Sequence, residues 1–328
     1  MTDNADHQHL PNEVSTLITT CKELVTLSKR SSVNNNLETT LKQCVSTRWN
    51  SVLRMLQSVN DNRTQLRTTA NDGPTNRKFL CVLSDLHDDI LEQVISVLLP
   101  FDTATKVLSA DKTPTLHIVL PTWYKLRQHL SDVSTDCDII ATLKRHLSQQ
   151  LDKYFVVSDI HAAATLLDPR LKNNGYLMSE ELKKDGIKAL NTLLMTMQSH
   201  APVPPVVEGQ EPPRKAAHLD TSAVTSDDYL HDLFTSPQLS LSSCTPEEEV
   251  TAYIGDTTDM VVTNVLKFWK LKELSWPRLA TVARILLGVP TTSTSSERSF
   301  SVAGRTLEER RSTLSPDHVD GLLFVHGL

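Results

Sequence analysis

Few residues of this sequence have the types and spacing that bind metal ions or perform catalysis. The five cysteines are widely spaced and form no C-x-x-C pair, so neither a disulfide framework nor a cysteine-based zinc site is expected, and a reducing compartment fits best. Cys81 and His87 have no partners at metal-ligand spacing, and His7 and His9 lie in a polar leader. We therefore expect no metal ion and no cofactor.

The charge distribution argues against a protein that binds nucleic acid by itself. The 328 residues carry a formal net charge of −6, and residues 200–260 alone hold 11 acidic and 2 basic residues. Neither this acidic stretch nor the remainder, at +3, forms a basic platform for phosphates. No apolar run approaches the ~18 residues of a membrane span, so no membrane partner is expected.

Apolar residues recur at steps of three and four through most of the chain, which predicts a mainly α fold with little or no sheet. The expected helices cover residues 10–25, 79–98, 116–130, 139–154 and 177–197, and Pro100 is expected to end the second. Asp85, His87, Asp88 and Asp89 would form a solvated polar face of that second helix.

Residues 200–245 differ from the rest in composition. Seven of the 16 prolines fall between positions 202 and 246, and large apolar residues are few, which predicts a disordered linker. Helical structure should resume with Pro246 in a first turn, followed by helices at 261–271 and from Ser275 to Gly288. A last helix is expected with Ser315 as its N-cap.

Four blocks of the sequence, taken together and in order, resemble the C-terminal part of hAT-superfamily transposases. They are Thr47–Ser51 with Met55-Leu56; Ala163–Lys172; Asn264–Lys270, a looser match; and Trp276–Ala280 with Val289–Gly304 and Arg310–Phe324. The structural motif residues that this resemblance singles out are Arg48, Trp49, Asp168, Pro169 and Arg298.

The resemblance implies a transposase-derived protein of the kind seen among BED-type zinc finger proteins. In that family a BED finger precedes a ribonuclease-H-like fold with a large helical insertion, and the C-terminal segment completes the fold and mediates dimerisation. We accordingly expect four parts: a leader and first helix (1–46), an insertion-type helical domain (47–199), the linker (200–245), and a C-terminal dimerisation region (246–328) that is a helical remnant of a truncated ribonuclease-H-like fold.

The resemblance also gives Glu297 two interpretations. Transposition uses three carboxylates around two cations ~3.5–4 Å apart, and Glu297 matches the third. The first two family aspartates lie on strands before the Thr-Arg-Trp-Asn block, whereas the 46 residues before Thr47 contain only Asp3 and Asp6 as aspartates, and no paired Cys and His of a BED finger. Alternatively, Glu297 completes a capping box with Thr294. We expect a vestigial carboxylate and no catalysis.

Two other motif pairs have structural as well as functional interpretations. Asp168-Pro169 predicts a helix stop with a buried hydrogen bond, because proline disfavours helix in the residue before it. Arg48 and Trp49 could position nucleic acid, but anchoring of the helix that follows is favoured.

The C-terminal region is the best candidate for a function, because the helix after Trp276 is apolar nearly all round. It is expected to combine core and interface, although a purely intrachain core remains open. The residues concerned are Phe268, Trp269, Trp276, Leu279, Val282, Ile285, Leu286, Phe300, Leu322, Leu323 and Phe324.

The sequence thus favours a catalytically inactive, transposase-derived protein that dimerises through residues 246–328. Its partner would be a second copy or a full-length hAT or BED-type relative, with weak or indirect DNA contact and, by resemblance, a nuclear location. The alternatives are a fragment of an active transposase that supplies the third carboxylate, and a DNA-associated nuclear regulator. Some BED-type relatives are described as SUMO ligases, but no residue here predicts that activity.

Overall fold

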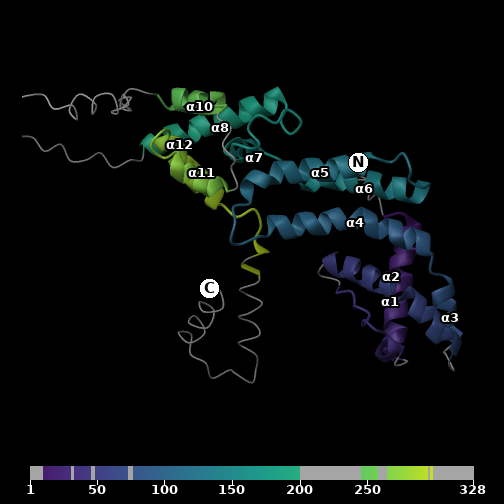
Figure 1. Cartoon of the computed structure of the whole chain (residues 1–328). Coiled ribbons are helices and arrows are strands. Elements are labelled where there is room, and N and C mark those ends of the chain that lie inside the picture. The colour runs from purple at the N-terminus through teal and green to yellow at the C-terminus, as the bar shows by residue number, and fades with distance from the viewer. Residues whose placement is uncertain are drawn as a thin grey trace, which may run out of the picture. The chain divides into compact units, whose positions relative to one another are not determined.

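A computed structural model describes residues 10–30, 33–45, 49–72, 77–199, 245–257, 264–294 and 296–297. All regular structure in these ranges is helical, which confirms the expected mainly α fold (Figure 1). The elements are α1 (Asn12–Arg30), η1 (Val33–Asn36), α2 (Trp49–Asp72), α3 (Arg77–Ser84), α4 (Asp88–Leu108), η2 (Leu116–Ile118), α5 (Val119–Ser131), α6 (Asp138–Tyr154), α7 (Asp159–Leu166), α8 (Glu180–Ser199), α10 (Pro246–Gly255), α11 (Val265–Leu271) and α12 (Pro277–Gly288).

The chain divides into two compact units, with the divisions inside α7 and α12. The larger unit comprises residues 1–165 and 287–328, and the smaller unit comprises residues 166–286. Helices α8 and α10, which come from either side of residues 200–244, pack together within the smaller unit. None of the helices described here combines the length and apolar character that a membrane-spanning helix needs.

The larger unit is a helical assembly around one hydrophobic core. Its α2 packs against α4, α4 against α5, and α5 against α6, while α1 packs against α2 and α3. The predicted stripe of α1 forms part of the core, and burial there raises the pKa of the Cys21 thiol to about 12. Fully buried residues from the other helices include Leu56, Phe79 and Leu91.

The prediction of one continuous helix over 79–98 is wrong. The segment forms two helices, because α3 ends at Ser84 and α4 begins at Asp88, so Asp85 and His87 lie in the break rather than on a helix face. Acidic residues in the first turn of α4 favour a helix start there, and Asp88 also forms an ion pair of 2.9 Å with Arg67.

The expected helix end at Pro100 is also wrong, since α4 continues through this proline to Leu108. Proline removes one backbone hydrogen bond from a helix. Burial continues on both sides of it, with Val97 before and Ala104 after the proline in the core. Tertiary packing therefore overrides the local preference.

The remaining expected helices are found close to their predicted positions. Residues 10–25 lie in α1, 116–130 in η2 and α5, 139–154 in α6, and 177–197 largely in α8. Pro246 and Pro277 begin α10 and α12, and Gly288 ends α12. The predicted linker, apart from Thr245, and the last helix after Ser315 lie outside the described residues.

A histidine caps the start of α7. The backbone N–H of Ser158 donates to His161 Nδ1 at 3.0 Å, and the N–H of His161 donates to the Ser158 carbonyl at 3.0 Å. The His161 side chain thus makes the bond that glutamate makes in a capping box, whereas the His161 N–H bonds to the Ser158 carbonyl instead of the hydroxyl. Because Nδ1 accepts the Ser158 N–H, His161 must be neutral in this arrangement. Burial lowers the pKa of His161, and Asp159 opposes this only in part.

This lowered pKa makes stability depend on pH. The folded chain binds a proton at His161 less tightly than the unfolded chain, so the free energy of unfolding should fall as the pH drops below about 6.5, the ordinary histidine value, until it passes the lowered pKa. Urea denaturation followed by circular dichroism at several pH values measures this. His161→Gln, which cannot titrate, should show a shallower pH dependence; an unchanged dependence would contradict the assignment.

Candidate functional site

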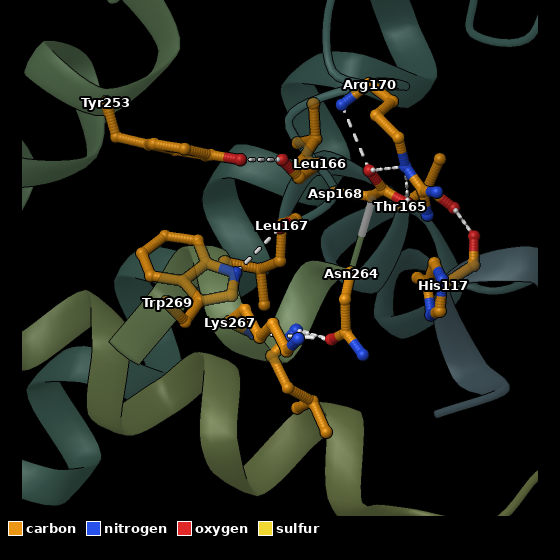
Figure 2. A network of polar contacts seen from close by, with 11 residues as sticks. His117, Thr165, Leu166, Leu167, Asp168, Arg170, Tyr253, Asn264, Lys267 and Trp269 are labelled. Carbon is orange, nitrogen blue, oxygen red and sulfur yellow. Dashed lines mark hydrogen bonds and ion pairs between the residues drawn. The ribbon is translucent and has the colours of Figure 1, made fainter. Parts of the chain in front are cut away.

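The block Ala163–Lys172 contains a helix end that is buried in the smaller unit. Helix α7 ends at Leu166, and the carboxylate of the fully buried Asp168 accepts the backbone N–H of Arg170 at 3.0 Å. The Arg170 guanidinium binds the same carboxylate through Nε at 2.9 Å and Nη2 at 2.6 Å, which raises the pKa of Arg170 (Figure 2). The Asp168 carbonyl accepts the N–H groups of Leu171 and Lys172, so the chain turns tightly here.

The end of α7 leaves buried carbonyl groups without helical partners, and two aromatic residues supply the donors. The Tyr253 hydroxyl donates to the Leu166 carbonyl at 2.8 Å, and Trp269 Nε1 donates to the Leu167 carbonyl at 2.8 Å (Figure 2). Tyr253 belongs to α10 and Trp269 to α11. Burial, assisted by nearby carboxylates, raises the pKa of Tyr253 well above its ordinary value, so this hydroxyl remains a donor.

Lys172 forms the reverse connection, from the block to the end of α10. Its Nζ donates to the carbonyls of Tyr253 and Asp256, each at 2.6 Å, and lies 4.3 Å from the centre of the Tyr253 ring. Burial lowers the pKa of Lys172, with Asp256 acting in the opposite direction. The two segments therefore cap each other's helix ends.

Four aromatic rings fill the space between α10, α11 and the start of α12. Tyr253, Phe268, Trp269 and Trp276 are all buried, and their ring centres lie 4.9 to 6.5 Å apart. Most of the pairs are tilted or edge-to-face, the favoured arrangements of aromatic rings. The aromatic residues that were candidates for core and interface thus form an intrachain core here.

Acidic residues of α10 cap two helices. Thr245 and Glu248 form a capping box at the start of α10 itself. The neighbouring Glu249 is buried, and its carboxylate accepts the backbone N–H of Leu279 in the first turn of α12 at 2.8 Å. One turn of sequence thereby fixes the starts of both helices.

The remaining predicted residues are buried, exposed or outside the described part of the chain. Leu279, Val282 and Leu286 are buried, whereas Ile285 is 54% exposed. The residues that lie outside the described part of the chain are Arg48, Arg298, Phe300, Leu322, Leu323 and Phe324.

The Trp-Asn pair of the first block lies at the start of α2 in the larger unit. Trp49 is 44% exposed, and the Asn50 amide donates to Asp102 Oδ1 at 3.1 Å. Asp102 is buried in α4, where its other oxygen pairs with Lys106 at 2.5 Å. The block therefore connects α2 to α4, through an aspartate that the sequence did not single out.

Glu297 is exposed and bonds to Ser293 rather than to Thr294, the predicted partner. Its backbone N–H donates to the Ser293 carbonyl at 3.0 Å, and its carboxylate accepts the Ser293 hydroxyl at 3.2 Å. The helical i to i−4 bond brings Ser293 against Glu297, one turn away. Nearby, Thr291 Oγ1 donates to the Leu108 carbonyl at 2.7 Å and anchors this loop. The described residues contain no cluster of three or more His, Cys, Asp or Glu that could hold a metal ion.

Sequence reasoning missed Tyr253, Lys172 and Glu249 as members of this arrangement. Pro169 does signal that carbonyl groups at the end of α7 need other donors. Which donors meet that need is not local information, because Tyr253 and Trp269 lie 87 and 102 residues away from their acceptors.

Removal of the Tyr253 hydroxyl tests this arrangement. Tyr253→Phe leaves the buried Leu166 carbonyl without its donor and should lower the free energy of unfolding by about 1–3 kcal/mol. Denaturant unfolding monitored by tryptophan fluorescence measures the change. Tyr176→Phe, at a position 84% exposed in the same unit, is the matched control and should have little effect. Equal losses in the two variants would contradict a specific role for this hydrogen bond.

Comparisons with known proteins match the sequence blocks described above. Residues 249–327 match the model of the hAT family C-terminal dimerisation region. Human zinc finger protein 618 is 24% identical over 96% of this chain and 30% of its own length, and human zinc finger BED domain-containing protein 4 is 25% identical over 87% and 24%. The Hobo transposase of Drosophila melanogaster is 26% identical over 48% of this chain and 24% of its own length.

The chain thus spans less than a third of the length of each of these three relatives. It is similar to a zinc finger BED domain-containing protein and to the Hobo transposase, as the resemblance of the four sequence blocks predicted. Residues 249–327 of this chain are therefore similar to the C-terminal dimerisation region of the hAT family.

Proposed function

We propose that this chain is a catalytically inactive dimerisation module, which pairs with a second copy or with a full-length hAT or BED-type relative through residues 246–328. The observation that carries the proposal is the match of residues 249–327 to a dimerisation region. The capped helix ends and the aromatic cluster of the smaller unit support it, because they provide a rigid base from which α12 presents its exposed side chains.

The proposed interface includes Ile285 together with Phe300, Leu322, Leu323 and Phe324. Ile285 is more than half exposed on a helix whose other large apolar residues are mainly buried. Burial of such a side chain against a partner is favourable by about 1.5–3 kcal/mol when complete. The other four residues enter the proposal through their sequence alone.

The proposal of inactivity is supported by the roles of the acidic side chains. Asp168 and Glu249 are buried and hold Arg170 and the first turn of α12, while the Glu297 carboxylate is bonded to Ser293. Two relatives are named as zinc finger proteins rather than as transposases, which also favours an inactive module over an enzyme. On the same basis we propose a nuclear location, indirect DNA contact, and an origin of the C-terminal helices in a ribonuclease-H-like fold.

A charge placed on α12 tests the interface. Ile285→Asp should weaken self-association at least about tenfold, because an unpaired carboxylate would become buried between the chains. Analytical ultracentrifugation over a range of concentrations measures this. The control is Met195→Asp, since Met195 is similarly exposed, at 51%, but lies on α8 outside the family region. A wild-type chain that stays monomeric and also fails to bind a full-length relative would refute the proposal.

A strand-cleavage assay distinguishes the module from a fragment of an active transposase. The purified chain, given Mg²⁺ or Mn²⁺ and duplex DNA with transposon ends, is expected to produce no nicks above the background seen without metal. Glu297→Gln serves as the matched variant. Metal-dependent cleavage that disappears in this variant would show that Glu297 is a catalytic ligand, and the inactive assignment would then be wrong.

A further inference from the structure

Helix α11 has an inner and an outer face. The inner side chains, Val265, Phe268 and Trp269, recur at helical spacing and are buried. The outer face consists of Leu266, Lys267, Lys270, Leu271 and Leu274, which extend into the turn after the helix and are all exposed. The Asn264 side chain, which accepts the N–H groups of Leu266 and Lys267, fixes the start of the helix (Figure 2).

The outer face combines apolar surface with positive charge. Leu266, Leu271 and Leu274 are 43, 69 and 85% exposed. Neighbouring cations have carboxylate partners, since Lys272 pairs with Asp256 and Arg284 with Glu273. In the part of the chain that the structure describes, Lys267 and Lys270 form no such ion pair. A surface of this composition suits an occupant that carries both acidic and large apolar side chains.

One segment of the same chain has this composition. Residues 227–234 read Asp-Asp-Tyr-Leu-His-Asp-Leu-Phe, with three acidic and four large apolar residues. The surrounding linker sequence is otherwise rich in Pro, Ser and Thr. The apolar positions of this segment recur at i, i+1, i+4 and i+5, the spacing at which side chains share one side of a helix.

The connection is long enough for this segment to reach the outer face. Ten residues lie between Phe234 and Thr245, and the eleven residue steps span up to about 36 Å when extended. From Thr245, α10 runs about 12 Å to Tyr253, whose ring centre lies 4.9 Å from that of Trp269 on α11. Passage to the other side of α11 adds about one helix diameter, 10–12 Å. The sum of these distances is shorter than the extended connection.

We propose that residues 227–234 dock on the outer face of α11 in the same chain. Asp227, Asp228 and Asp232 pair with Lys267 and Lys270, and the apolar side chains of the segment cover the three exposed leucines. A short covalent connection gives the segment an effective concentration in the millimolar range, so a weak contact suffices for occupancy. A partner protein that uses this face of the dimerisation region must first displace the segment.

A zero-length carbodiimide tests the docking on the full chain. The reagent joins a lysine ammonium to a carboxylate only when the two are in direct contact, and mass spectrometry locates the resulting amide. We expect crosslinks from Lys267 or Lys270 to the aspartates of residues 227–234. Leu271→Ser with Leu274→Ser keeps both lysines but removes apolar contacts, and should lower the crosslink yield about tenfold.

The matched control is Tyr176→Ser with Met195→Ser, two exposed apolar residues of the same unit, which should leave the yield unchanged. An equal mixture of ¹⁵N-labelled and unlabelled chains identifies the source of the segment. Crosslinked peptides of purely labelled or purely unlabelled mass support docking within one chain. Hybrid masses would assign the face to a second copy, and an absence of these crosslinks would exclude the docking; either result overturns the proposal. Crosslinks within one chain depend neither on Ile285 nor on dimerisation, so their absence would leave the proposed function unaffected.

Discussion

The smaller unit depends on the need of buried carbonyl groups for hydrogen-bond donors. Pro169 stops α7, and the carbonyls of Leu166 and Leu167 then lie where water does not reach them. Tyr253 and Trp269 donate hydrogen bonds to these carbonyls. Lys172 in turn donates to the Tyr253 carbonyl at the end of α10. A buried carbonyl without a donor lowers the free energy of unfolding by about 1–3 kcal/mol, a substantial part of the net stability of a domain. These few hydrogen bonds therefore determine which segments far apart in sequence must lie together.

The parts of this structure that follow from local chemistry could be predicted from the sequence. The stripe of α1, the prolines that begin α10 and α12, and the glycine that ends α12 all act within one or two turns. The break between α3 and α4 and the passage of α4 through Pro100 could not be predicted, because packing against other helices decides them. For the same reason, the sequence singled out Trp269 as an anchor but not the carbonyl that it binds.

The segment that matches the dimerisation-region model packs against residues outside the match. The family match begins at Glu249, inside α10, yet the rings of Tyr253 and Trp269 are held by residues 166–172, and α10 packs on α8. The described half of the region is therefore one side of a composite fold. Phe268, Trp269 and Trp276, which resemble interface anchors in the sequence, are buried within the chain.

The packing of α8 on α10 has a consequence for how such chains diverge. The two helices flank the 45 residues from 200 to 244 and hold both ends of that connection at fixed points. The entropy of closing a loop grows only with the logarithm of its length, so a doubling of the connection costs about 0.6 kcal/mol. Insertions and deletions between these helices should therefore be nearly neutral for folding, and related chains are free to vary this tether in length while the framework on either side stays the same.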